Sequence, residues 1–168
     1  GAGGLDVAVA MATGTYYLQC PSVVKVNLVG KKAKWASAKD VILYILQQLS
    51  VKGGVNKIIE YTGEGLKELS LTDRATICNM GAELGATTSV FPTDEITKEY
   101  LIQQGREEDY VELKADEDAT YDEEITVDLS KLVPLTAKPH SPDAVVPVSE
   151  LRGMKINQVV IGSCTNSS

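Results

Sequence analysis

The chain has 168 residues, of which 43% are hydrophobic, and its formal net charge is −7 at pH 7. This length fits one ordinary domain, or one domain with parts of its neighbours. The negative charge argues against a general nucleic-acid binder, which would carry a basic patch. No stretch approaches the roughly eighteen consecutive apolar residues of a membrane-spanning helix, so we expect neither nucleic acid nor a membrane as a partner.

The cysteines Cys20, Cys78 and Cys164 are widely spaced and odd in number. Such spacing is not typical of a disulfide framework and indicates a reducing compartment. The sequence contains no Cys-x-x-Cys pair, so local cysteine spacing alone cannot hold a metal cluster in this chain.

The first element is a predicted helix over residues 3–12, where Leu5, Val9 and Ala12 recur at helical spacing and Gly14 marks the end. A boundary follows near Cys20-Pro21.

Strands and helices then alternate along the chain. The β-branched runs at 23–29 and 57–62 predict two strands, and between them Ser37 and Asp40 form a capping box for a helix over 38–49. Further helices are predicted over 72–84 and 92–104, and further strands over 87–91 and 124–129. Alternation of this kind is typical of a three-layer α/β/α fold with a mostly parallel sheet, and we assign residues 21–132 to it.

The segment that follows contains Pro134, Pro139, Pro142 and Pro147, a composition that predicts an extended linker over residues 133–150. The apolar run from Met154 to Ile161 then predicts the first strand of a further domain over residues 151–168.

Two places could carry chemistry. Asn79 and Glu83 lie four residues apart, so both should point from one helical face, and the small Gly81 and Ala82 beside them would let a ligand approach. A carboxylate and an amide so placed can hold a water or a metal-bound hydroxyl. The alternative is a plain helix with two polar residues facing solvent.

The other place is Cys164, at the predicted carboxyl end of the last strand. The small polar residues from Thr165 to Ser168 could donate hydrogen bonds to a thiolate there. The alternative is a polar turn that contains a cysteine by coincidence.

Three stretches resemble the aconitase family, in the same order and from the first residue to the last. They are Gly1–Ala12 (GAGGLDVAVAMA), Ala75–Pro92 (ATICNMGAELGATTSVFP) and Ile161–Ser168 (IGSCTNSS). The resemblance covers essentially the whole chain.

The resemblance implies an aconitate hydratase, which interconverts the tricarboxylic acids citrate and isocitrate through cis-aconitate on a 4Fe–4S cluster. By resemblance, Cys164 supplies the first of three cysteine ligands, and Asn79 and Glu83 belong to the active site facing the cluster. Cys78 would be a packing residue. Residues 1–20 would end the preceding domain.

The other ligands and the serine base of the family have no match here. We therefore expect a segment of a longer enzyme that is inactive and without a cluster in isolation.

Alternatives remain at this point. Within the family, the large subunit of isopropylmalate dehydratase and homoaconitase are alternatives, although Thr87–Pro92 and Gly4–Ala12 look more like aconitase proper. An alternative of another class is a stand-alone α/β binding module. The expected location is the bacterial cytoplasm or the mitochondrial matrix.

Overall fold

A computed structural model describes residues 3–162. Its centre is a four-stranded sheet in the order β3-β2-β1-β4, with every neighbouring pair parallel. The strands are β1 (Ser22–Val29), β2 (Lys57–Thr62), β3 (Thr88–Val90) and β4 (Glu123–Asp128). The strand β1 is one of the two inner strands, and its Val26 lies opposite both Tyr61 of β2 and Ile125 of β4.

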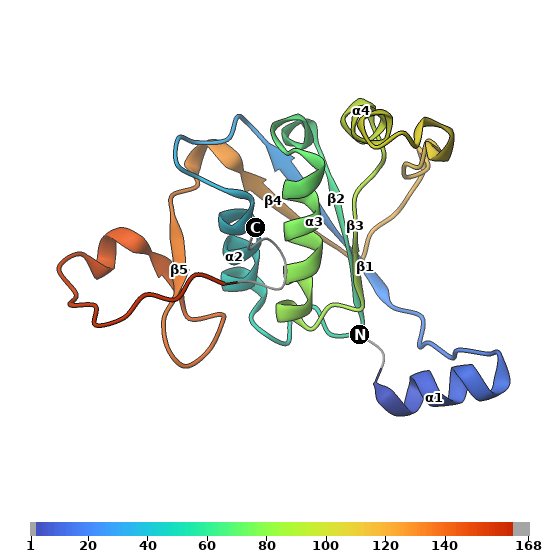
Figure 1. Cartoon of the computed structure of the whole chain (residues 1–168), viewed down its shortest axis with the longest axis horizontal. Coiled ribbons are helices and arrows are strands. Elements are labelled where there is room, and N and C mark those ends of the chain that lie inside the picture. Colours follow the sequence, from blue (N-terminus) through green and yellow to red (C-terminus); the bar gives the residue numbers. More distant parts are fainter. Residues whose placement is uncertain (1–2, 163–168) are drawn as a thin grey trace.

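The two faces of the sheet differ. Along β1, Val24, Val26 and Leu28 are fully buried, while Lys25 and Asn27 between them are only half-buried. The buried face is covered by α2 (Ala38–Leu49) and α3 (Leu71–Met80), which lie side by side in front of the sheet (Figure 1). The α/β class, with its mostly parallel sheet flanked by helices, is confirmed and is consistent with the expected three-layer arrangement.

The helix α2 begins where the sequence predicts. Ser37 donates from both its backbone N–H and its hydroxyl to Asp40 Oδ2, at 2.7 Å in each case. The apolar stripe of the helix is buried against the sheet and α3 through Val41, Ile42 and Ile45. This stripe forms the middle of the core.

Beyond β3 the chain leaves the sheet edge. Asp94 caps α4 (Glu95–Gln103) by accepting a hydrogen bond from the Thr97 N–H at 3.1 Å. A short 3-10 helix, η3 (Glu107–Asp109), and an exposed acidic segment then lead back to β4.

The segment predicted to be an extended linker contains regular structure. Two short antiparallel strands, β5 (Leu135–Ala137) and β6 (Val145–Pro147), form a hairpin that contacts α2, and η5 (Val148–Leu151) follows. The prolines permit this because Pro147 is the last residue of its strand and the other three lie outside the ladder.

The two ends of the described chain are more exposed than its centre. The helix α1 (Gly4–Thr13) forms as predicted, but none of its residues is buried by the described part of the chain. The predicted strand over residues 154–161 is wrong. No strand is assigned there, and Ile156, Val160 and Ile161 are exposed, because no described strand lies alongside to pair with them. Within residues 3–162, no helix is both long and apolar enough to cross a membrane.

Candidate functional site

The predicted site helix begins with a complete capping box. Asp73 N–H donates to Ser70 Oγ at 3.1 Å, and Ser70 N–H donates to Asp73 Oδ2 at 3.1 Å. The sequence predicts one helix as far as Leu84, but α3 ends at Met80. It continues as a 3-10 turn, η2 (Gly81–Leu84), which Gly85 ends with a left-handed φ of 75°.

Asn79 therefore lies on the last turn of α3 and Glu83 on η2, and both are exposed. A 3-10 turn has three residues per turn rather than 3.6, so the two residues do not stack as on an uninterrupted α-helix. The structure brings them to one end of the domain, on consecutive turns, without joining them in a hydrogen bond described here.

That end is where the strands begin. Leu84 O accepts the Gly54 N–H at 2.9 Å, and Lys57 O, at the start of β2, accepts the Thr87 N–H at 2.9 Å. Ligands of open α/β sheets bind at the carboxyl ends of the strands. Asn79 and Glu83 lie at the opposite end of the sheet, where the strands begin.

Cys78 faces the other way, toward β3. Its thiol donates to Ser89 O at 3.6 Å, and burial raises the pKa of Cys78 to about 11. The thiol is therefore neutral at pH 7. Cys78 acts as a packing residue, as predicted, and is a poor thiolate donor.

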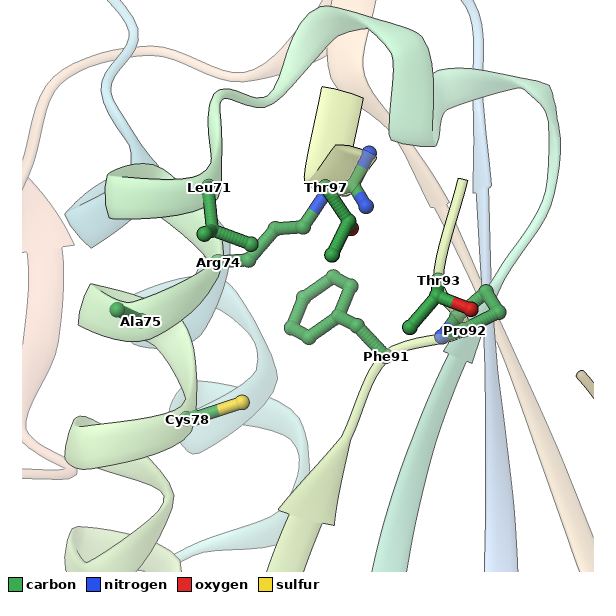
Figure 2. A pocket seen from close by; sticks show the side chains of 8 residues that line it. All are labelled: Leu71, Arg74, Ala75, Cys78, Phe91, Pro92, Thr93 and Thr97. Atoms are coloured by element: carbon green, nitrogen blue, oxygen red, sulfur yellow. The ribbon is translucent and has the colours of Figure 1, made fainter. Parts of the chain in front are cut away.

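A pocket of about 230 Å³ opens between α3, the end of β3 and α4. Figure 2 shows Phe91 pointing toward α3, with Arg74 stretched across one edge of its ring and Cys78 directed at it from the helix. The ring of Phe91 stacks on Tyr61 with 4.4 Å between centroids. The lining is mainly apolar, and the only charged group in it is the Arg74 guanidinium.

Arg74 is 2% exposed and forms an ion pair with Asp94, whose side chain is 32% exposed. Its two terminal nitrogens contact Asp94 at 3.0 and 2.6 Å, and one of them also reaches Leu66 O at 3.0 Å. Burial alone would raise the pKa of Asp94, but the hydrogen bonds from Arg74 and Thr97 hold it below its usual value. The pair therefore links the start of α3 to the cap of α4.

Sequence reasoning missed this pair. The available signal is that Arg74 lies three residues before Ile77, on the buried stripe of the helix, where a lone charge needs a partner.

Comparison with known proteins identifies the family. A model of the aconitase family (aconitate hydratase) matches residues 1–153. The chain belongs to the aconitase family.

Similar proteins carry the name 3-isopropylmalate dehydratase large subunit. The chain is 45% identical to large subunit 2 of Archaeoglobus fulgidus over 166 residues, which are 99% of this chain and 40% of that protein. It is 47% identical to the large subunit of Caldicellulosiruptor saccharolyticus over 167 residues, 99% of this chain and 39% of that protein. It is 43% identical to large subunit 2 of Rubrobacter xylanophilus over 168 residues, 100% of this chain and 39% of that protein.

The chain thus spans about two fifths of the length of the curated relatives it matches. Their names agree with the alternative that the sequence left open, isopropylmalate dehydratase, rather than with aconitate hydratase.

A 4Fe–4S cluster, which aconitase-family proteins use, needs thiolates that converge. Residues 3–162 contain two free thiols, the exposed Cys20 and the neutral Cys78, and no group of three residues able to hold a metal. These thiols do not fit a cluster. The predicted ligand, Cys164, lies outside the described residues.

Proposed function

We propose that this chain is part of the large subunit of an isopropylmalate dehydratase, a hydro-lyase of the aconitase family. The observation that carries the proposal is the 43–47% identity to such subunits across essentially all of this chain. The substrate class is a small 2- or 3-hydroxy acid with at least two carboxylates.

The reaction removes a proton from one carbon and a hydroxyl from its neighbour, leaving a double bond and one water; the reverse step adds water back. We propose that the Glu83 carboxyl group gives a proton to the departing hydroxyl, which leaves as water, and takes the proton back when water adds, since it can carry a negative charge and its exposed position lets substrate reach it. Asn79, one turn earlier, would orient the substrate through its amide.

Cys164 is proposed to supply one thiolate to a 4Fe–4S cluster whose remaining ligands lie outside this chain. Such a cluster supplies Lewis-acid chemistry when bound. The described residues contribute the surface that carries Asn79 and Glu83.

Aconitate hydratase is the second candidate, with citrate, cis-aconitate and isocitrate as substrates. The stretches Thr87–Pro92 (TTSVFP) and Gly4–Ala12 favour it because they resemble aconitase proper. The two candidates differ in the group beside the reacting carbons, which is apolar in isopropylmalate and a carboxylate in citrate.

The test is to express the complete reading frame that contains this sequence, both alone and together with an isopropylmalate dehydratase small subunit, reconstitute it anaerobically with iron and sulfide, and measure kcat/KM on both substrates. Preference for isopropylmalate, with a requirement for a second subunit, supports the first candidate. Preference for citrate without a second subunit would replace it by aconitate hydratase. Turnover of neither acid would overturn both.

The role of Glu83 has its own test. Glu83→Gln should lower kcat by about 10²–10⁴-fold and leave the melting temperature unchanged, because the amide cannot accept the proton and the residue is exposed. The matched control is Glu117→Gln in the exposed acidic segment, which should change neither quantity. Wild-type kinetics in Glu83→Gln would make Glu83 an ordinary surface carboxylate.

A further inference from the structure

The turn that carries Glu83 lies directly on β3. Gly81, its first residue, is buried, and its N–H points at the carbonyls of Ile77, Cys78 and Asn79, where the α-helix gives way to the 3-10 turn. On the strand opposite, Ser89 Oγ is enclosed and has no hydrogen-bond partner among the described residues.

The space around Gly81 leaves little room for a side chain. Its φ of −58° and ψ of −23° are ordinary helical values that any residue adopts, so backbone conformation does not require glycine. A methyl group added at Gly81 would overlap Ser89 Oγ, while its distance to Ser89 Cβ would be 3.5 Å, an ordinary contact. A side chain at position 81 therefore requires either that the Ser89 hydroxyl rotate away or that the turn shift away from β3.

The other side of the turn is equally close to its neighbour. A Cβ at Gly54 would lie 2.9 Å from Leu84 O and 3.0 Å from Leu84 Cβ, and Leu84 is fully buried. Leu84 O is also the acceptor of the Gly54 N–H. Glu83 therefore lies, with Ala82, on the exposed side of a turn held between β3 and the loop before β2.

We propose that Gly81 is a positioning residue for Glu83, and that its close approach to Ser89 sets where the carboxylate stands. This inference rests on the proposed function of Glu83. A shift of the turn away from Ser89 would leave the fold intact but move the carboxylate, and a misplacement of about 1 Å can cost about 10²-fold in rate.

The test is a double-mutant cycle of Gly81→Ala and Ser89→Ala. In the 168-residue chain, Gly81→Ala should lower the melting temperature, and Ser89→Ala should relieve that loss because the overlapping oxygen is gone. In the complete enzyme, Gly81→Ala should lower kcat about 10–100-fold in the Ser89 background and less than about 3-fold in the Ser89→Ala background, with KM little changed. The control is Gly4→Ala, where nothing lies within 4 Å of the added Cβ.

The possible outcomes of the cycle separate the contact between Gly81 and Ser89, the positioning role of Gly81 and the proposed function. Additive melting temperatures would overturn the contact itself, whatever the enzyme does. Coupled melting temperatures with equal kcat losses in both backgrounds would reduce Gly81 to a purely structural residue and overturn the positioning role. Absence of turnover in the wild-type complete enzyme would overturn the proposed function, and the positioning role with it, while the coupling in melting temperature would still establish the contact.

Discussion

The two segments that flank the central domain, residues 3–20 and 133–151, are attached to it in opposite ways. The first is rich in large apolar side chains, yet Leu5 is 78% and Met11 83% exposed. The second is rich in proline, yet it lies against α2 with Val145 buried. Figure 1 shows α1 extended away from the sheet and the β5–β6 hairpin beside α2.

The difference comes from hydrogen bonds that bridge distant parts of the sequence. Asp40 Oδ1 accepts the Leu135 N–H at 2.6 Å, and Asp143 Oδ2 accepts the Val51 N–H at 3.1 Å. Gln47 donates its side-chain amide to Val145 O at 2.9 Å. Carboxylates and an amide thus satisfy backbone groups of the hairpin and of the turn after α2, so hydrophobic content alone is a poor guide to which segment is docked.

Hydrogen exchange should show the largest difference between the two segments. The Leu135 amide should exchange only through opening of the domain, which costs several kcal/mol. The amides of α1 should be protected by less than about tenfold, because a ten-residue helix without tertiary packing is marginal in water. Strong protection of α1 in the monomeric 168-residue chain would contradict the comparison.

Matched substitutions of the acids in the first turns of α1 and α2 should show the next largest difference between the two segments. Asp40→Ala removes the acceptor for Ser37 and Leu135, leaving partly buried N–H groups unpaired, and should cost about 2–4 kcal/mol of unfolding free energy. Asp6→Ala removes the equivalent acid of α1, which accepts the Gly3 N–H at 3.2 Å, and should cost less than about 0.5 kcal/mol. Urea denaturation measures both, and equal losses would show that α1 unfolds together with the domain.

The sequence was sufficient for the central domain because its signals are local. The alternation in β1, the stripe of α2 and the box at Ser37 each involve residues within one element, and the structure confirms all of them. The hairpin could not be predicted, because the partners of Asp40 and Asp143 lie more than ninety positions away in the chain. The predicted strand near Ile161 fails for a related reason, since a strand exists only with a neighbour.

The candidate site was predictable only in part. Asn79 and Glu83 were selected by their spacing and by resemblance, and both are accessible, but their catalytic roles stay predictions. The change from α-helix to 3-10 turn at Gly81 was not predicted, because the spacing of Asn79 and Glu83 was interpreted on one continuous helix. The Arg74–Asp94 pair was missed because its two members belong to different helices.

Substitution of one valine in each segment tests how much apolar packing stabilises that segment. Val145→Ala opens space at a position only 4% exposed and should cost about 1–3 kcal/mol. Val9→Ala, at a position 43% exposed, should change stability by less than about 0.5 kcal/mol, since alanine is the better helix former and no described contact is lost. Thermal melts of the two variants measure the two losses of stability. A larger loss in Val9→Ala than in Val145→Ala would refute the comparison.

The smallest effect is expected from pH. Hydrogen bonds from the Ser141 hydroxyl and the Val51 N–H lower the pKa of Asp143 below its usual value. A lowered folded-state pKa means that the ionised carboxylate stabilises the docked hairpin. This stabilisation is complete above the ordinary aspartate pKa of about 3.9 and is lost as pH falls through the lower folded value.

Asp143→Asn keeps the shape of the side chain but removes the charge. The wild type should therefore melt above Asp143→Asn at pH 7, by less than the shift of Val145→Ala, and the gap should close as the pH approaches 3. Exchange of the Val51 amide, measured in both proteins over the same range, gives a local readout of the same bond. Asp6→Asn in α1 should leave the melting temperature of the domain unchanged throughout, because α1 makes no described contact with it. A gap that stays constant from pH 7 to 3 would mean that the hairpin is held by packing at Val145 and by the Asp40 and Gln47 bonds, with no contribution from the charge of Asp143.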